Sequence, residues 1–137
     1  METLFKNRFL EIMIDRERKF AQVAYFEETQ NLTVEEYIEN TTTTANYFKT
    51  FLNEGIDKIL FDTRNNFYPI SVDLQEWTVK QFEQFSQINY KSATILSTDL
   101  ITMLSIEQAV DGFNDQNKRL NNSFFDNEED AMEWLYS

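Results

Sequence analysis

Residues 58–77 decide the fold, and they read KILFDTRNNFYPISVDLQEW. The first four form an apolar run that is too short for a helix, and a run with two apolar faces is typical of a central parallel strand covered by helices on both sides. The polar segment that begins at Asp62 predicts a loop, and Ser71 is placed to cap the next helix. In open α/β sheets, binding groups gather just beyond the carboxyl ends of such strands. The stretch therefore predicts a site as well as a fold.

Composition predicts a single domain over residues 1–137. Hydrophobic residues make up 42% of the chain and 13 residues are phenylalanine, which suits a packed core and argues against disorder. The chain has no cysteine and no histidine, so thiol catalysis, imidazole bases and Cys/His zinc sites are excluded. Paired carboxylates alone are too common to indicate acid–base catalysis. We therefore expect no enzyme, no metal site and no cofactor.

Charge limits the possible partners. The net charge is −12, from 24 acidic and 12 basic residues, and this disfavours nucleic acid phosphates and anionic lipid surfaces. No window approaches the roughly 20 apolar residues of a membrane span, and the first residues lack the apolar core of a signal peptide. We expect a cytoplasmic protein that neither binds nucleic acid nor spans a membrane. The sequence leaves the oligomeric state open.

The residues before the central strand predict a hairpin and a helix. Two β-like runs over 9–14 and 20–26 are joined by a short polar turn, which is typical of a β-hairpin. Thr33 and Glu36 fit a capping box at a helix start. The helix that follows has apolar or small residues at helical spacing, which predict its buried face: Val34, Ile38, Thr41, Ala45, Phe48 and Leu52.

The residues after the central strand predict an alternation of helices and strands. A helix from Ser71 is followed by a short strand over 92–96, a helix over 100–113, a weak edge strand over 119–125 and a short terminal helix. A second capping box at 105–108 leaves the start of the helix over 100–113 open. The order β-β-α-β-α-β-α-β-α predicts an α/β domain with a mixed sheet that is parallel after the hairpin.

Three passages give the chain a resemblance to a known family. They are ILFDTR at 59–64 leading to Ser71 and QEW at 75–77, ATILS at 93–97 followed by Asp99, and FFDNEEDAMEWL at 124–135. With these, the whole chain resembles the SpoIIAA-like proteins of the STAS superfamily, the domain shared by sulfate transporters and anti-sigma-factor antagonists. More narrowly, it resembles the small bacterial STAS/CRAL-TRIO-like proteins. The resemblance implies a STAS-like fold and a regulatory role in signalling.

The resemblance also implies a role for Ser71. Anti-sigma-factor antagonists have a phosphorylatable serine at the start of the helix after the central strand, usually within Asp-Ser-x-Gly. Ser71 matches that location, while its surroundings read PISVD and differ from the motif. A phosphate at a helix N-terminus is tolerated by the helix dipole and would repel a partner fitted to a hydroxyl. Ser71 is thus a candidate phosphoacceptor, and the alternative is an ordinary N-cap.

The loop after the central strand is the candidate site for a partner or ligand. Its polar residues are Asp62, Thr63, Arg64, Asn65 and Asn66, with Ser71 at its end. Arg64 could hold a carboxylate or phosphate through two hydrogen bonds. The alternative is that Asp62 and Arg64 pair with each other and only stiffen the loop.

Two functions stay open at this point. The first is a non-enzymatic regulatory domain that presents the loop 62–71 and the following helix to a protein partner. The alternative is a binding or sensing module for a small apolar or anionic ligand, lipid-like if the CRAL-TRIO resemblance applies. In that case Trp77, Trp134 and the phenylalanines could line a cavity, whereas aromatic residues at helical spacing more often fill a core.

Overall fold

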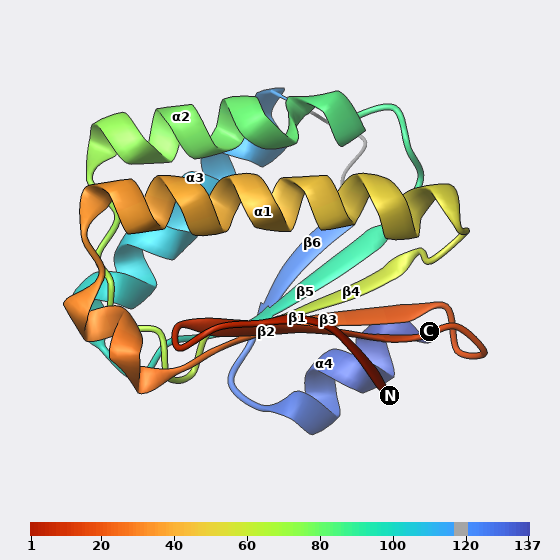
Figure 1. Ribbon diagram of the computed structural model, residues 1–137. Helices are drawn as coiled ribbons and strands as arrows, with labels where there is room; N and C mark the ends of the chain where they lie inside the picture. The colour runs from red at the N-terminus through yellow and green to blue at the C-terminus, as the bar shows by residue number, and fades with distance from the viewer. Residues whose placement is uncertain (117–120) are drawn as a thin grey trace.

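Six strands form one mixed sheet in the computed structural model, which describes residues 1–116 and 121–137 (Figure 1). The strands lie in chain order: β1 (Glu2–Lys6), β2 (Leu10–Asp15), β3 (Phe20–Tyr25), β4 (Lys58–Asp62), β5 (Lys91–Ile95) and β6 (Asn121–Phe125). The first three are antiparallel neighbours, and β3 to β6 run parallel. The predicted α/β class, the hairpin and the mixed sheet are confirmed.

Three helices cover one face of the sheet and a fourth covers the other (Figure 1). The first three are α1 (Val34–Asn53), α2 (Val72–Phe82) and α3 (Leu100–Gln116), and the fourth is α4 (Glu128–Leu135). Each of the first three connects two parallel strands that are next to each other in the sheet. Because such crossovers are right-handed and the strands advance in one direction, the three helices must lie on one face. Two 3-10 helices, η1 (Glu27–Asn31) and η2 (Glu83–Phe85), follow β3 and α2.

The central strand is buried on both faces, as the sequence predicts. Ile59 and Leu60 point to opposite sides of β4, and both are fully buried. Ile59 belongs to the larger core beneath α1 and α2. Leu60 packs in the smaller core with Ala131 and Leu135 of α4. Residues 58–62 therefore form the strand on which both cores rest.

The first strand was not predicted. β1 pairs with β2 at the edge of the sheet, with an irregularity between Thr3 and Phe5. Its side chains are exposed or half-buried, so the residues show no clean alternation of apolar and polar side chains. An edge strand of this kind gains its order from pairing with a neighbour, which a local sequence pattern does not report.

Helix α1 begins where the capping box predicts. The Thr33 hydroxyl accepts a hydrogen bond from the Glu36 amide at 3.1 Å, and the Glu36 carboxylate accepts one from the Thr33 amide at 3.0 Å. The helix ends before Gly55, whose φ of +87° is a left-handed conformation that glycine adopts without strain.

The predicted buried face of α1 was wrong in its first turns. Val34 and Ile38 are 52% and 38% exposed. The buried residues of the helix instead include polar side chains: Tyr37, Asn40, Thr44, Ala45, Phe48, Phe51 and Leu52. A pattern that counts only apolar residues cannot detect an inward face that carries hydroxyl and amide groups, and the helix is therefore rotated from the predicted orientation.

Helix α3 begins at Leu100 without a break. The Asp99 carboxylate accepts hydrogen bonds from the amide and the hydroxyl of Thr102 at 3.0 Å and 2.6 Å, which lowers the pKa of Asp99. The second predicted capping box does not form, because the Ser105 hydroxyl lies inside the helix and donates to the Thr102 carbonyl. The predicted strand over 119–125 is observed from Asn121, and its first two residues lie outside the described part of the chain.

Candidate functional site

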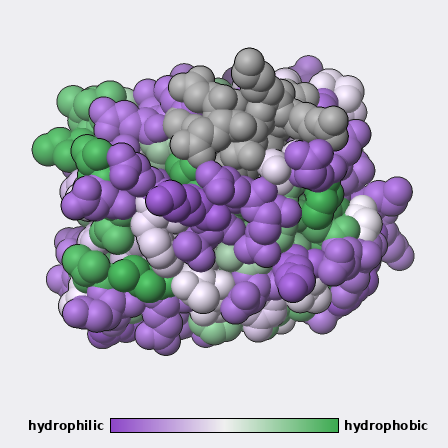
Figure 2. All heavy atoms as spheres, turned by 90° about the horizontal axis from the view of Figure 1, so that it is seen from above, coloured by the Kyte–Doolittle hydropathy of each residue, from purple (hydrophilic) through white to green (hydrophobic). Residues whose placement is uncertain are grey.

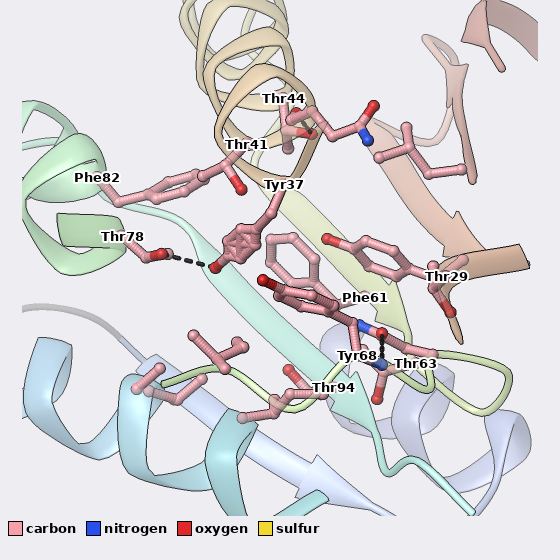
Figure 3. Close-up of a pocket in the computed structure, with 18 of the residues that line it drawn as sticks. Thr29, Tyr37, Thr41, Thr44, Phe61, Thr63, Tyr68, Thr78, Phe82 and Thr94 are labelled. Carbon is pink, nitrogen blue, oxygen red and sulfur yellow. Dashed lines mark hydrogen bonds between the residues drawn. The ribbon is translucent and has the colours of Figure 1, made fainter. Parts of the chain in front are cut away.

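A cavity of about 170 Å³ lies between the sheet and the three helices α1, α2 and α3 that cover one of its faces (Figure 3). Strands β2 to β6 contribute residues to its floor, and α1, α2 and α3 form its walls and roof. Eight aromatic side chains are among the residues that line it: Phe9, Tyr25, Tyr37, Phe48, Phe61, Tyr68, Phe82 and Tyr90. The walls are therefore largely apolar, with several phenolic hydroxyls among them.

Hydroxyl and amide groups supply the polar part of the lining. They come from helices, strands and the loop after β4: Thr29, Asn40, Thr41, Thr44, Thr63, Asn66, Thr78, Ser92, Thr94 and Asn122. None of the described lining residues is Asp, Glu, Lys or Arg. Because an unpaired charge in an apolar site costs far more than a hydrogen-bonded neutral group, the cavity suits an uncharged molecule.

Tyr37 lies at the centre of this lining (Figure 3). Its ring contacts Tyr68, with the ring centroids 5.1 Å apart. Its hydroxyl is 2.6 Å from the Thr78 hydroxyl, which in turn donates to the Leu74 carbonyl. Burial raises the pKa of Tyr37, although its hydrogen bonds with Thr78 and Thr41 act in the opposite direction. The phenol is therefore neutral at ordinary pH, and it joins α1 to α2.

The predicted site residues divide into two groups. Thr63 and Asn66 are buried and line the cavity. Asp62 and Arg64 pair with each other through two hydrogen bonds of 2.9 Å and 2.6 Å, and this pairing raises the pKa of Arg64. The mutual pairing that the sequence offered as an alternative for these two residues is therefore observed. Asn65 is exposed and is not among the residues that line the cavity.

Ser71 is the N-cap of α2, and it is exposed. Its hydroxyl accepts a hydrogen bond from the Leu74 amide at 3.4 Å. The Gln75 side chain donates to the Ile70 carbonyl just before it. Ser71 thus lies at the end of the loop 62–71, but it does not line the cavity.

The loop between β4 and α2 is held in place by buried side chains. The Thr63 hydroxyl donates to the Ile95 carbonyl and the Ser97 hydroxyl donates to the Asn66 carbonyl, at 2.5 Å and 2.6 Å. At its far end, the Ile70 amide donates to the Ser105 hydroxyl at 2.9 Å. Because the partners of the loop in these hydrogen bonds come from β5, the loop after β5 and α3, the loop forms a fixed wall of the cavity.

The sequence predicted that aromatic residues at helical spacing more often fill the core than line a cavity, and it did not single out the hydroxyl-bearing residues of the lining apart from Thr63. Trp77 and Trp134, named as possible lining, are not among the described lining residues, and Trp134 of α4 packs on Phe125 of β6. One feature of the sequence could have indicated the polar lining, namely pairs of hydroxyl residues spaced so that both members lie on the same face of a helix or strand. Thr41 and Thr44 are three residues apart on a helix, and Ser92 and Thr94 are two apart on a strand, so each pair lies on one face.

Comparison with known proteins finds no family model, no curated protein and no solved structure that matches the chain. Within the described residues, no helix is both long and apolar enough to cross a membrane. The same residues contain no group of three or more acidic side chains arranged to hold a metal ion.

Proposed function

We propose that this protein binds a small, uncharged and largely apolar molecule in the cavity beneath α1, α2 and α3. The observation that supports this is the lining: eight aromatic rings, several hydroxyls and no charged side chain among the described lining residues. Apolar pockets with a few convergent polar groups are the usual form of small-molecule sites. An anion that entered the cavity would lose its hydrating water and would meet no positively charged side chain among the described lining residues. An uncharged ligand is therefore favoured over an anionic one.

The size of the cavity restricts the ligand further. An apolar cavity of roughly 150 Å³ is large enough to hold benzene, and this cavity is about 170 Å³. A molecule with one ring fits such a volume, whereas a long acyl chain does not. Of the ligands that the sequence left open, the small apolar molecule is favoured over the lipid.

Filling the cavity should remove binding. Ala109 of α3 lines the cavity and is buried, so Ala109→Leu places three additional carbons in the ligand's space. We expect the affinity for toluene, used as a probe, to fall at least about tenfold, because the probe and the leucine compete for the same volume. Toluene titrations followed by protein NMR measure this affinity.

The control introduces a leucine outside the site. Thr42 is exposed on α1, and Thr42→Leu should leave the toluene affinity unchanged. The melting temperature of Ala109→Leu reports whether it is folded, and cavity-filling changes commonly leave stability equal or raised. Toluene binding by folded Ala109→Leu at wild-type affinity would contradict the proposed function, and so would failure of wild type to bind both toluene and phenol.

A second candidate is a cytoplasmic regulatory domain of the STAS type that binds a protein partner through the loop 62–71 and α2. Its support is an exposed apolar group at the end of the molecule where α2 and α3 begin: Val72, Leu100, Ile101 and Leu104. Figure 2 shows apolar side chains at the left end of the helical face, where the helices begin in Figure 1. Ser71 directly precedes Val72, so a phosphate there would alter this surface.

The test compares two variants of Ser71 with a change in the apolar group. Ser71→Ala retains a neutral surface and Ser71→Asp adds a charge, so we expect a partner captured by wild type to bind Ser71→Ala and to be lost with Ser71→Asp and with Ile101→Glu. Affinity capture with quantitative mass spectrometry measures this. Equal recovery by all four proteins would exclude the second candidate and leave the cavity proposal unaffected.

A further inference from the structure

The floor of the cavity is polar on one side. Ser92 and Thr94 are two residues apart on β5, so both side chains point to the helical face of the sheet. They are 3% and 4% exposed, and both line the cavity. Buried positions on a central strand are usually occupied by aliphatic residues, and Ala93 and Ile95 on the opposite face of the same strand follow this rule.

The two hydroxyls make no hydrogen bond with any other described residue. Every described side-chain nitrogen or oxygen that is fully sealed from solvent does have a partner. The oxygens of Ser92 and Thr94 must therefore have surface that opens into the cavity, since their residues are buried everywhere else. A hydroxyl can both donate and accept a hydrogen bond, so these two groups present both functions to whatever occupies the cavity.

The neighbouring strands give this polar floor an aromatic border. The register places Thr94 beside Phe61 of β4, and adjacent strands are about 4.8 Å apart. Phe61 stacks on Phe48, with the ring centroids 5.6 Å apart. On the other side of β5, Ser92 lies beside Asn122 of β6, which also lines the cavity. The cavity thus changes from aromatic over β4 to polar over β5 and β6.

Above the polar floor, helix α3 contributes only aliphatic side chains to the described lining. These are Ile106, Ala109 and Val110. They offer no hydrogen bond of their own to a ligand, so the polar contacts on this side come from the strands. A ligand in the cavity is therefore directed by two features, the rings on one side and the hydroxyls of β5 on the other.

Resting on the proposed function, we infer that the ligand class is a small aromatic molecule with one uncharged hydroxyl or carbonyl group. Its ring lies against Phe61 and Phe48, and its polar group forms hydrogen bonds with Ser92 and Thr94. A site built with buried hydroxyls discriminates against an analogue that cannot pair with them, because the hydroxyls are then left without a partner. The same molecule in anionic form is rejected because no described lining residue is charged.

Three probes of similar size test the inference on the full chain: toluene, phenol and benzoate. Isothermal titration calorimetry measures their affinities for wild type and for the double variant Ser92→Ala/Thr94→Val, in which the shape of residue 94 is retained. We expect phenol to bind wild type about tenfold more tightly than toluene, and benzoate not to bind. In the double variant, phenol should bind no more tightly than toluene, while toluene affinity should be retained.

Two further variants keep the test decisive. Ser123→Ala removes a hydroxyl from β6 on the opposite face of the sheet, beside Ala93, and should preserve the preference for phenol. Thr94→Val alone should reduce that preference severalfold, and it replaces the double variant if the latter does not fold. Toluene binding without a preference for phenol, or a preference that survives both variants, would overturn the inference and leave the proposed function standing. Failure of both toluene and phenol to bind wild type would overturn the two together.

Discussion

Replacing Phe48 with alanine should lower the free energy of unfolding by about 3–5 kcal/mol. Phe48 is 1% exposed and lies where α1, α2 and the sheet meet. Its ring contacts five other rings, at centroid distances of 4.9–6.3 Å: Phe51, Phe61, Phe82, Phe85 and Tyr90. The loss combines the removed contacts with the additional empty volume, since the surrounding side chains relax only partly.

Urea unfolding followed by tryptophan fluorescence measures this loss. Phe48→Leu retains much of the apolar volume and should cost less than half as much as the alanine variant. Phe26→Ala provides the comparison outside the core, because Phe26 is only half-buried at the end of β3. A loss below about 1 kcal/mol for Phe48→Ala would mean that the rings around it close the gap, and the core would then be softer than its packing implies.

Much of the fold could be predicted because its signals are local. The run at 58–61 needs only its length and its two apolar faces to identify a central strand, and Ile59 and Leu60 are buried on opposite faces. The capping box at Thr33 and Glu36 forms within four residues. The short polar turn at 15–19 lies between the two runs that form the hairpin of β2 and β3. None of these features requires a distant residue to be placed first.

The cavity could not be predicted in this way. Its lining joins residues that are far apart in the chain, such as Thr29 in η1, Thr94 in β5 and Ala109 in α3. Locally, Tyr37 and Thr44 resemble residues of an exposed helix face, and only the rotation of α1 shows that they point inward. Of the site residues predicted in the loop 62–71, only Thr63 and Asn66 line the cavity. The charges of Asp62 and Arg64 made both residues candidates for a binding site, but the two side chains form an ion pair with each other.

Thr29 gives the second large expected effect, because one hydroxyl joins three backbone groups. Thr29 is fully buried. Its hydroxyl accepts a hydrogen bond from the Phe67 amide at 2.9 Å and lies 2.9 Å and 3.3 Å from the carbonyls of Phe26 and Asn65. Thr29→Val preserves the shape but leaves the amide without its acceptor. We expect a loss of about 2–3 kcal/mol in the free energy of unfolding.

The same substitution should also weaken binding, since Thr29 fixes the wall that contains Asn66 and Tyr68. Loss of that anchor allows the loop to move, and toluene affinity should then fall together with stability. Thr29→Ser is the control, because it keeps the hydroxyl and removes one methyl group, and it should retain most of both properties. Urea unfolding and toluene titration of the same samples separate the outcomes. If Thr29→Val lost stability but bound toluene at wild-type affinity, the loop would not shape the cavity; if it lost neither, the Phe67 amide must find another acceptor.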